Sequence, residues 1–314
     1  LAYIFETHTG ALLYEIPQDD VLYWTATYSP DGRYMTTADQ RGVIHLWDVQ
    51  TGQEARRFSH TLPANVSAFT PEGQFLVTGI DDGTISFWDL QARPAQIDIA
   101  GAGHMEGKIA FTSDGEELLS HGRVFDSHTG ARGPDTGVVE GFSALSRDGR
   151  TAMILNWHPF EIRVLDPRTW ATRLVQPVEC MEQPYGIGIS PDGSLIAIGS
   201  FNAPYKICVY DSQSGEVVRV IDNVGLSHKF AFTADNRILL SAECWAGTHL
   251  FDVSTGAVIR SLQETSAPGS CSSDDVSVSP DGTLILTGGY SGVAELWELS
   301  TGKLLRTFVG HTDI

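Results

Sequence analysis

The 314-residue chain carries 20 Lys and Arg residues against 39 Asp and Glu residues, a formal net charge of −19 with neutral histidines. Nucleic acids and anionic membranes are bound largely through Lys and Arg side chains, so we expect neither as a partner. The apolar runs are far shorter than the roughly 20 residues that a membrane-spanning helix needs. The length allows one domain with a large core and an acidic, solvated surface.

The chain opens on a short segment, residues 1–16, that contains Phe5-Glu6 and Thr9-Gly10. Seven longer units follow, each with a turn similar to Ser-Pro-Asp-Gly. Their acidic turn residues lie 34 to 46 positions apart: Asp31, Glu72, Asp114, Asp148, Asp192, Asp235 and Asp281. Each unit closes on a second phrase: Trp47-Asp48, Trp88-Asp89, Phe125-Asp126, Leu165-Asp166, Tyr210-Asp211, Phe251-Asp252 and Trp297-Glu298. The sequence is therefore an internal repeat.

Each unit is predicted to contain about four strands. Segments such as 43–48 (VIHLWD) and 84–89 (TISFWD) are short and rich in β-branched and aromatic residues, and Asp and Gly turn residues flank them. Pro-Asp-Gly favours a tight turn, because Pro fixes φ and Gly accepts a positive φ. No helical periodicity is present. A period near 40 residues with four strands in each repeat predicts an all-β propeller of four-stranded antiparallel blades.

Residues 60–90, HTLPANVSAFTPEGQFLVTGIDDGTISFWDL, resemble a repeat of the WD-repeat β-propeller family, and residues 276–302 are nearly as similar. The resemblance extends over essentially the whole chain. In that family a His, a Ser or Thr, a turn Asp and the Trp form a structural hydrogen-bond network, which the resemblance assigns to His60, Thr78, Asp82 and Trp88. The pattern lapses elsewhere, where Arg41 and Ser291 occupy the turn-Asp position and Leu165 replaces the Trp.

Both ends of the sequence fall inside a repeat. Residues 1–16 read as strands c and d of a preceding or closing blade, ahead of a propeller over residues 17–314, and the last residues, from Gly310, read as the start of another repeat. Three arrangements stay open: seven closed blades with an appended hairpin, an eighth blade completed by strands beyond residue 314, or a window on a longer array. We expect a closed ring of seven or eight blades in a fragment of a longer protein, because closure removes exposed strand edges.

The third unit is the weakest. The spacing from Asp114 to the next acidic anchor is the shortest of the series, and the turn between its second and third strands shrinks to about His121-Gly122. Its last strand contains Gly133, Pro134 and Gly137, which an outermost strand tolerates.

Motifs for catalysis are absent from the sequence. It contains no G-x-S-x-G, no P-loop and no H-E-x-x-H, its histidines are scattered, and paired acids such as Asp81-Asp82 occupy predicted turns. We therefore expect no catalytic residues, no cofactor and no metal site, and we expect that the protein is not an enzyme.

Aromatic residues recur at the turn between the second and third strands of four successive units. They are Trp157, Phe201, Trp245 and Tyr290, and we call them the aromatic arc. Nearby loops add His158, Tyr185, Arg41, Phe160 and Tyr205. Trp, Tyr and Arg dominate binding hot spots, so the arc, assisted by Arg41, His158 and Tyr185, is a candidate partner-binding face. The alternative is that each ring packs on a neighbouring loop.

Two connections between units are long, residues 176–184 and 263–275, and long loops on a rigid scaffold often carry recognition. The four cysteines form no C-x-x-C pair, and Cys208 lies in an apolar run where we expect a reduced core thiol. That state favours a reducing, cytoplasmic location.

We expect a non-catalytic scaffold or sensor domain that binds a protein or peptide, within a larger signalling or assembly protein. Two alternatives remain. One is a propeller that binds a small molecule or catalyses a reaction at the channel mouth, and the other is an architectural domain packed against its own chain. The oligomeric state is not determined by the sequence.

Overall fold

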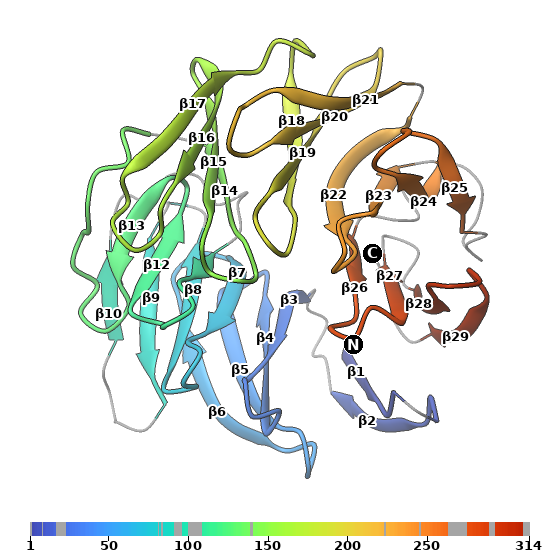
Figure 1. The fold of residues 1–314 in the computed structure, drawn as a ribbon. Helices are drawn as coiled ribbons and strands as arrows, with labels where there is room; N and C mark the ends of the chain where they lie inside the picture. Colours follow the sequence, from blue (N-terminus) through green and yellow to red (C-terminus); the bar gives the residue numbers. More distant parts are fainter. Residues whose placement is uncertain are drawn as a thin grey trace. The chain divides into compact units, whose positions relative to one another are not determined.

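The described part of the chain is all-β. The computed structural model describes residues 2–7, 9–16, 23–80, 82, 84–90, 96–99, 109–138, 141–222, 224–244, 246–262, 275–288 and 293–309, and these ranges contain strands and no helix (Figure 1). Consecutive strands pair antiparallel into sheets that follow one another along the chain, as expected for the blades of a β-propeller. The chain divides into two compact units, residues 1–143 and 144–314.

The first unit holds a hairpin and three blades. The hairpin consists of β1 (Ala2–Phe5) and β2 (Leu12–Ile16). Blade one consists of β3 (Tyr23–Tyr28), β4 (Tyr34–Asp39), β5 (Val43–Asp48) and β6 (Glu54–Ser59). Blade two consists of β7 (Ala64–Phe69), β8 (Phe75–Ile80), β9 (Ile85–Asp89) and β10 (Gln96–Ile99). Blade three consists of β11 (Ala110–Phe111), β12 (Glu117–Ser120) and β13 (Arg123–Asp126).

The second unit holds four blades, and the unit boundary falls inside the first strand of blade four. Blade four consists of β14 (Gly141–Leu145), β15 (Ala152–Trp157), β16 (Phe160–Leu165) and β17 (Thr172–Pro177). Blade five consists of β18 (Pro184–Ile189), β19 (Leu195–Ser200), β20 (Lys206–Asp211) and β21 (Val217–Asp222). Blade six consists of β22 (Leu226–Phe232), β23 (Ile238–Cys244), β24 (Gly247–Asp252) and β25 (Val258–Ser261). Blade seven consists of β26 (Asp275–Val278), β27 (Leu284–Gly288), β28 (Val293–Glu298) and β29 (Leu304–Val309).

Six of the seven predicted units have four strands in the described ranges, and the third has three. A single bridge between Phe125 and Arg132 stands where its fourth strand was predicted. The predicted all-β fold with four-stranded antiparallel sheets is confirmed, and in this unit the predicted fourth strand is reduced to that bridge. Gly133 and Pro134 follow the bridge directly, and both residue types weaken a strand.

The opening segment forms the predicted two-stranded hairpin and packs as a neighbouring sheet against blade one. Ile4 and Ile16 lie in one buried cluster with Met35 and Trp47 of that blade. The side-chain hydroxyl of Tyr14 donates to the carbonyl oxygen of Gln50. The choice between seven and eight blades, and the grouping of residues 1–16 and 17–314 into one domain, stay predictions.

The core lies in the middle strands of each blade. All six residues of β8 are buried, whereas the outermost strand β17 alternates between exposed and half-buried positions. Apolar clusters join successive blades within each unit, such as Phe230 and Phe232 of blade six with Ile207 and Val209 of blade five. A parallel bridge between Ile187 and Lys229 also joins these two blades into one eight-stranded sheet.

The repeated acidic turn is held by its own side chains. In blade five, Asp192 Oδ1 accepts hydrogen bonds from the Ser190 hydroxyl at 2.8 Å and from the Ser194 N–H at 2.9 Å. Gly193 has a φ of 72°, which an L side chain rarely adopts. The Asp148 N–H of blade four donates to the Pro191 carbonyl oxygen at 3.0 Å, so neighbouring turns are also linked.

Candidate functional site

A pocket of about 540 Å³ opens between the loops of blades four and five, at the end of these blades opposite the acidic turns. We call it the aromatic pocket, and it is lined by Trp157, His158, Phe160, Glu182, Gln183, Pro184, Tyr185 and Phe201. Blade four supplies the first three residues, from the hairpin between β15 and β16. Blade five and the loop before it supply the rest.

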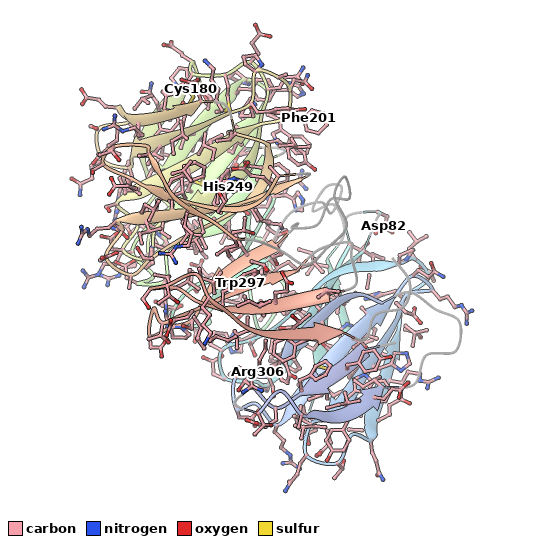
Figure 2. The ribbon with its side chains drawn as sticks, turned by 90° about the vertical axis from the view of Figure 1, so that its right-hand side faces the viewer. Asp82, Cys180, Phe201, His249, Trp297 and Arg306 are labelled. Atoms are coloured by element: carbon pink, nitrogen blue, oxygen red, sulfur yellow. A yellow bond between two sulfur atoms is a disulfide. The ribbon has the colours of Figure 1, made fainter. Side chains whose placement is uncertain are left out.

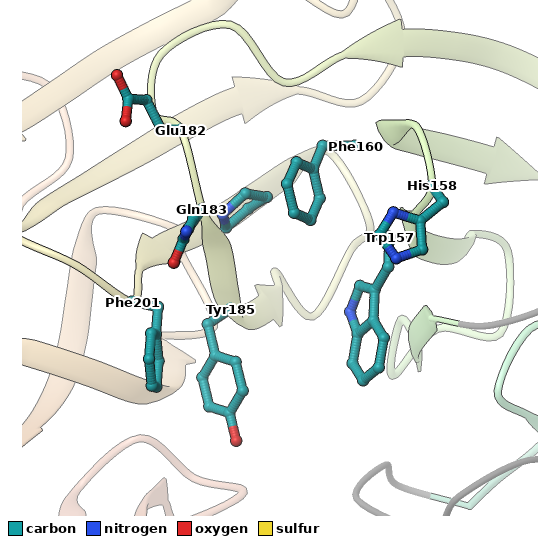
Figure 3. Close-up of a pocket in the computed structure, with 8 residues that line it drawn as sticks. Trp157, His158, Phe160, Glu182, Gln183, Tyr185 and Phe201 are labelled. Atoms are coloured by element: carbon teal, nitrogen blue, oxygen red, sulfur yellow. The ribbon is translucent and has the colours of Figure 1, made fainter.

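The rings stand on two sides of the aromatic pocket. Figure 3 shows Tyr185 and Phe201 on one side, Trp157 and His158 on the other, and Phe160 between them. The Tyr185 and Phe201 ring centroids are 5.1 Å apart with an interplanar angle of 52°. The His158 and Phe160 centroids are 6.2 Å apart, and Trp157 pairs directly with Phe160 across the hairpin. The pairing register of the β15–β16 and β18–β19 hairpins thus determines which side chains form the two sides of the aromatic pocket.

Phe201 is the most conspicuous of these rings, because it is 45% exposed directly after a strand whose last residues are buried (Figure 2). An exposed ring in this position does not contribute to the blade core. Together with its neighbours it gives the pocket an apolar, aromatic lining, the usual character of a recognition site.

Several hydrogen bonds hold the loop at residues 178–183 in place. The Val178 N–H donates to the Phe160 carbonyl oxygen at 3.0 Å, and the Phe201 N–H donates to the Gln183 carbonyl oxygen at 2.8 Å. The Asn202 side-chain amide donates to Gln183 Oε1 at 2.7 Å. Backbone bonds therefore join both ends of this loop to residues that line the pocket.

A disulfide between Cys180 and Cys208 fastens the middle of the same loop to β20 (Figure 2). The expected reduced thiol at Cys208 is wrong, because the chain folds residue 180 back over a strand 28 positions later, which spacing alone does not reveal. Disulfides persist in oxidising surroundings, so Cys208 no longer supports the cytoplasmic location. That location stays a prediction.

Tyr210 makes a further contact with this loop. Burial raises the pKa of the Tyr210 hydroxyl to about 12, with a smaller contribution in the same direction from the Glu179 carboxylate. The hydroxyl therefore stays protonated at neutral pH. It lies 2.9 Å from Cys180 Sγ, and since a disulfide sulfur carries no proton, the hydroxyl donates.

The structure brings four of the seven predicted partner-binding residues to the aromatic pocket: Trp157, His158, Tyr185 and Phe201. Arg41 lies in the first unit, exposed in the turn after β4, where its N–H donates to Asp39 Oδ1 at 2.8 Å. Trp245 and Tyr290 lie outside the described residues, as do residues 263–274 of the second long loop.

Three lining residues were not singled out from the sequence: Glu182, Gln183 and Pro184. The sequence did point to this region, because all three residues belong to the long connection 176–184. The structure assigns Gln176 and Pro177 of that connection to β17 and leaves a shorter loop.

Three of the four residues proposed as a structural network, His60, Thr78 and Trp88, are joined by hydrogen bonds in blade two. Thr78 Oγ1 is 2.7 Å from His60 Nε2 and accepts a hydrogen bond from Trp88 Nε1 at 2.8 Å. Asp82 lies in the adjoining turn, where hydrogen bonds from Thr84 hold the pKa of its carboxyl below the usual range. The nearby His60 adds a smaller shift in the same direction.

The Trp–Thr bond recurs in two other blades and is replaced in four. Trp47 Nε1 donates to Thr37 Oγ1 in blade one, and Trp297 Nε1 donates to Thr287 Oγ1 in blade seven, both at 3.0 Å. Strand register places these pairs at the corresponding positions: Phe125 with Ser120, Leu165 with Ile154, Tyr210 with Ile198, and Phe251 with Ser241. Blades four and five, which form the aromatic pocket, thus carry an aliphatic residue in place of the Thr.

Among the described residues, no three His, Cys, Asp or Glu side chains are grouped so that they could hold a metal ion. Within the same ranges, no helix has the length and apolarity to cross a membrane.

Known proteins share the repeat and the fold. The family model described as WD domain, G-beta repeat, matches residues 5–48, 53–89 and 261–298, so the chain contains WD40 repeats at three positions. These matches contain the three tryptophans of the Trp–Thr bonds. Four of the seven units give no match to that model, in keeping with their altered pairs.

Two relatives align with short parts of the chain. Nuclear distribution protein nudF of Aspergillus niger is 36% identical over 85 residues, which are 27% of this chain and 18% of that protein. Eukaryotic translation initiation factor 3 subunit I of Phaeosphaeria nodorum is 51% identical over 39 residues, 12% of each chain. The chain thus spans less than a fifth of either relative.

The crystal structure of the computationally designed Ika8 protein superposes with a TM-score of 0.72 and covers 93% of this chain and 88% of that one. The sequences are 18% identical, so this likeness concerns the fold alone.

Proposed function

We propose that this WD40-repeat β-propeller is a non-catalytic platform that binds a protein or peptide through the aromatic pocket. Proteins with WD40 repeats generally act as scaffolds for protein interaction. The observation that carries the proposal is an apolar pocket of about 540 Å³ between blades four and five, lined by five aromatic side chains counting His158. A role within a larger signalling or assembly protein belongs to the same proposal. In a cytoplasmic location the 178–183 loop would be held by its hydrogen bonds alone, because cytosolic thiols are kept reduced.

The 178–183 loop beside the aromatic pocket is already ordered, which supports the proposal of a binding site. Ordering loops and side chains upon association weakens binding, and a site that is ordered beforehand avoids that loss. Here the 178–183 loop is held by its disulfide and by two backbone hydrogen bonds before any partner arrives. Phe201, exposed at the pocket, would gain the burial that makes an aromatic residue a binding anchor.

The test is affinity capture from a lysate of the source organism, with quantitative identification of retained proteins. The bait is the wild-type chain, compared with a Trp157→Ala, Phe201→Ala double variant. Tyr28→Ala is the matched control, because Tyr28 is 50% exposed and is not a lining residue. All baits must melt at the same temperature before they are compared.

Retention of one partner by the wild type and by Tyr28→Ala, but not by the double variant, is the expected result. Equal retention by all three baits would move the binding site away from the aromatic pocket. Retention by none would favour the architectural alternative, in which the surface is covered by other parts of the same protein.

A further inference from the structure

The aromatic pocket has a charge preference as well as an apolar lining. Among its eight lining residues the carboxylate of Glu182 is the permanent charge, and none of them is Lys or Arg. The chain as a whole carries a net charge of −19. A partner segment that approaches this pocket is therefore favoured when it is positively charged.

Ring faces favour the same sign of charge. The face of an aromatic ring carries the negative end of its quadrupole, so a cation within about 6 Å of the ring centroid is attracted to it, most strongly by Trp. The rings of Trp157, Phe160, Tyr185 and Phe201 stand around one space (Figure 3). A cation in that space would lie close to several rings.

Arg fits this space better than Lys. Its guanidinium group is planar, stacks on aromatic faces and is more weakly hydrated than an ammonium group, so it loses less on entering an apolar pocket. A volume of about 540 Å³ holds a long side chain together with part of its neighbours in an extended segment.

We propose that the aromatic pocket takes an arginine side chain from an extended basic segment of a partner protein. The inference rests on the proposed function and names the chemistry that the site selects. Stacking between the rings supplies most of the selection. Glu182 contributes less, because its exposed carboxylate lies at the edge of the pocket and is turned away from the rings (Figure 3).

The test uses three short peptides that differ at one residue. Each carries Gly and Ser around a central arginine, a central citrulline or a central lysine. Citrulline keeps the planar shape of arginine and removes its charge. Binding is followed in the full chain by the NMR signal of the Trp157 indole N–H, one of seven tryptophans, assigned with Trp157→Phe.

We expect the arginine peptide to shift the Trp157 indole signal and to bind about tenfold more tightly than the citrulline peptide, with lysine between them. Phe201→Ala should abolish the shift and Tyr28→Ala should leave it unchanged. Glu182→Gln should weaken binding about twofold, with the difference lost at high salt. Non-specific electrostatic attraction of the peptide to the acidic chain would persist in Phe201→Ala. This variant therefore distinguishes non-specific binding from binding in the aromatic pocket.

Equal binding of arginine and citrulline peptides, both lost in Phe201→Ala, would overturn the charge preference and leave the proposed function standing. No shift with any peptide at millimolar concentration would also overturn the inference. The capture experiment would then decide the proposed function by itself.

Discussion

Blades one, two and seven differ from blades four and five at one buried pair. The first group joins a Trp to a Thr by a hydrogen bond inside the blade, as Trp88 and Thr78 do. The second group places an aliphatic residue at the Thr position, Ile154 or Ile198. Replacing both partners of a buried hydrogen bond with apolar groups can be nearly neutral, so a blade tolerates either solution.

In blade five the residue at the Trp position makes a different contact, because no Thr hydroxyl is present to bind it. Tyr210 occupies the Trp position, and its hydroxyl reaches the Cys180 sulfur in the loop of the aromatic pocket. A side chain that forms a hydrogen bond inside the blade elsewhere thus contacts the loop of the aromatic pocket here. The two blades that carry an aliphatic residue at the Thr position are the ones that form the candidate site.

The largest effect on stability is expected from removing the disulfide that joins the 178–183 loop to blade five. Cys180→Ala removes a disulfide that spans 28 residues and should lower the free energy of unfolding by about 3 kcal/mol, measured by denaturant titration. The variant should also broaden the Trp157 indole signal, because the loop beside the pocket gains freedom. Wild type in reducing agent should match it, and unfolding at the same denaturant concentration with and without reductant would contradict the assignment.

An intermediate effect is expected in blade two. Thr78→Val keeps the shape of a fully buried side chain and removes the hydroxyl that bonds Trp88 and His60. Leaving the buried Trp88 Nε1–H without this acceptor should lower the free energy of unfolding by about 2 kcal/mol. The matched control is Ile198→Val, which removes one methylene from the equivalent position and should cost about 1 kcal/mol.

If Thr78→Val and Ile198→Val lowered the free energy of unfolding equally, the hydrogen bond would contribute no stability beyond side-chain packing. The difference between the two groups of blades would then have no effect on stability. Thermal denaturation of both variants at the same pH and protein concentration provides the comparison.

The smallest effect is expected at the turn that all blades share. Burial disfavours the Asp192 carboxylate, but hydrogen bonds from Ser194, Asn236 and Ser190 outweigh it and lower its pKa from 3.8 to about 2. Because the folded-state pKa lies below the unfolded one, the stabilisation is nearly complete above pH 4 and is lost as the pH falls through about 2. Screening of this exposed group reduces its contribution to about 1 kcal/mol.

Asp192→Asn should therefore be less stable than the wild type at pH 7, and the difference should shrink as the pH falls from 4 to about 2, as measured by denaturant titration across this range. Asp31→Asn in blade one should show the same direction, because hydrogen bonds from Ser29 and Arg33 lower the pKa of that carboxyl. A stability difference that did not depend on pH would mean that the turn is held by geometry and not by charge.

The sequence by itself determined the blades. Turn chemistry at Asp192 and Gly193 and the short apolar strands act between residues that are close in the chain, so the pattern was sufficient to place most strands. It also pointed to the turn aromatics and to the connection 176–184. The weak third unit was visible in its spacing, although its missing strand was not.

Only the tertiary structure decided the site. Trp157 and Phe201 are 44 residues apart in the sequence, and they meet at one pocket because blades four and five lie side by side. The Cys180–Cys208 bond and the contact from Tyr210 depend on a loop that folds back over a strand, which no spacing rule reports. Local patterns fix strands and turns, whereas a pocket exists only where separate blades bring their loops together.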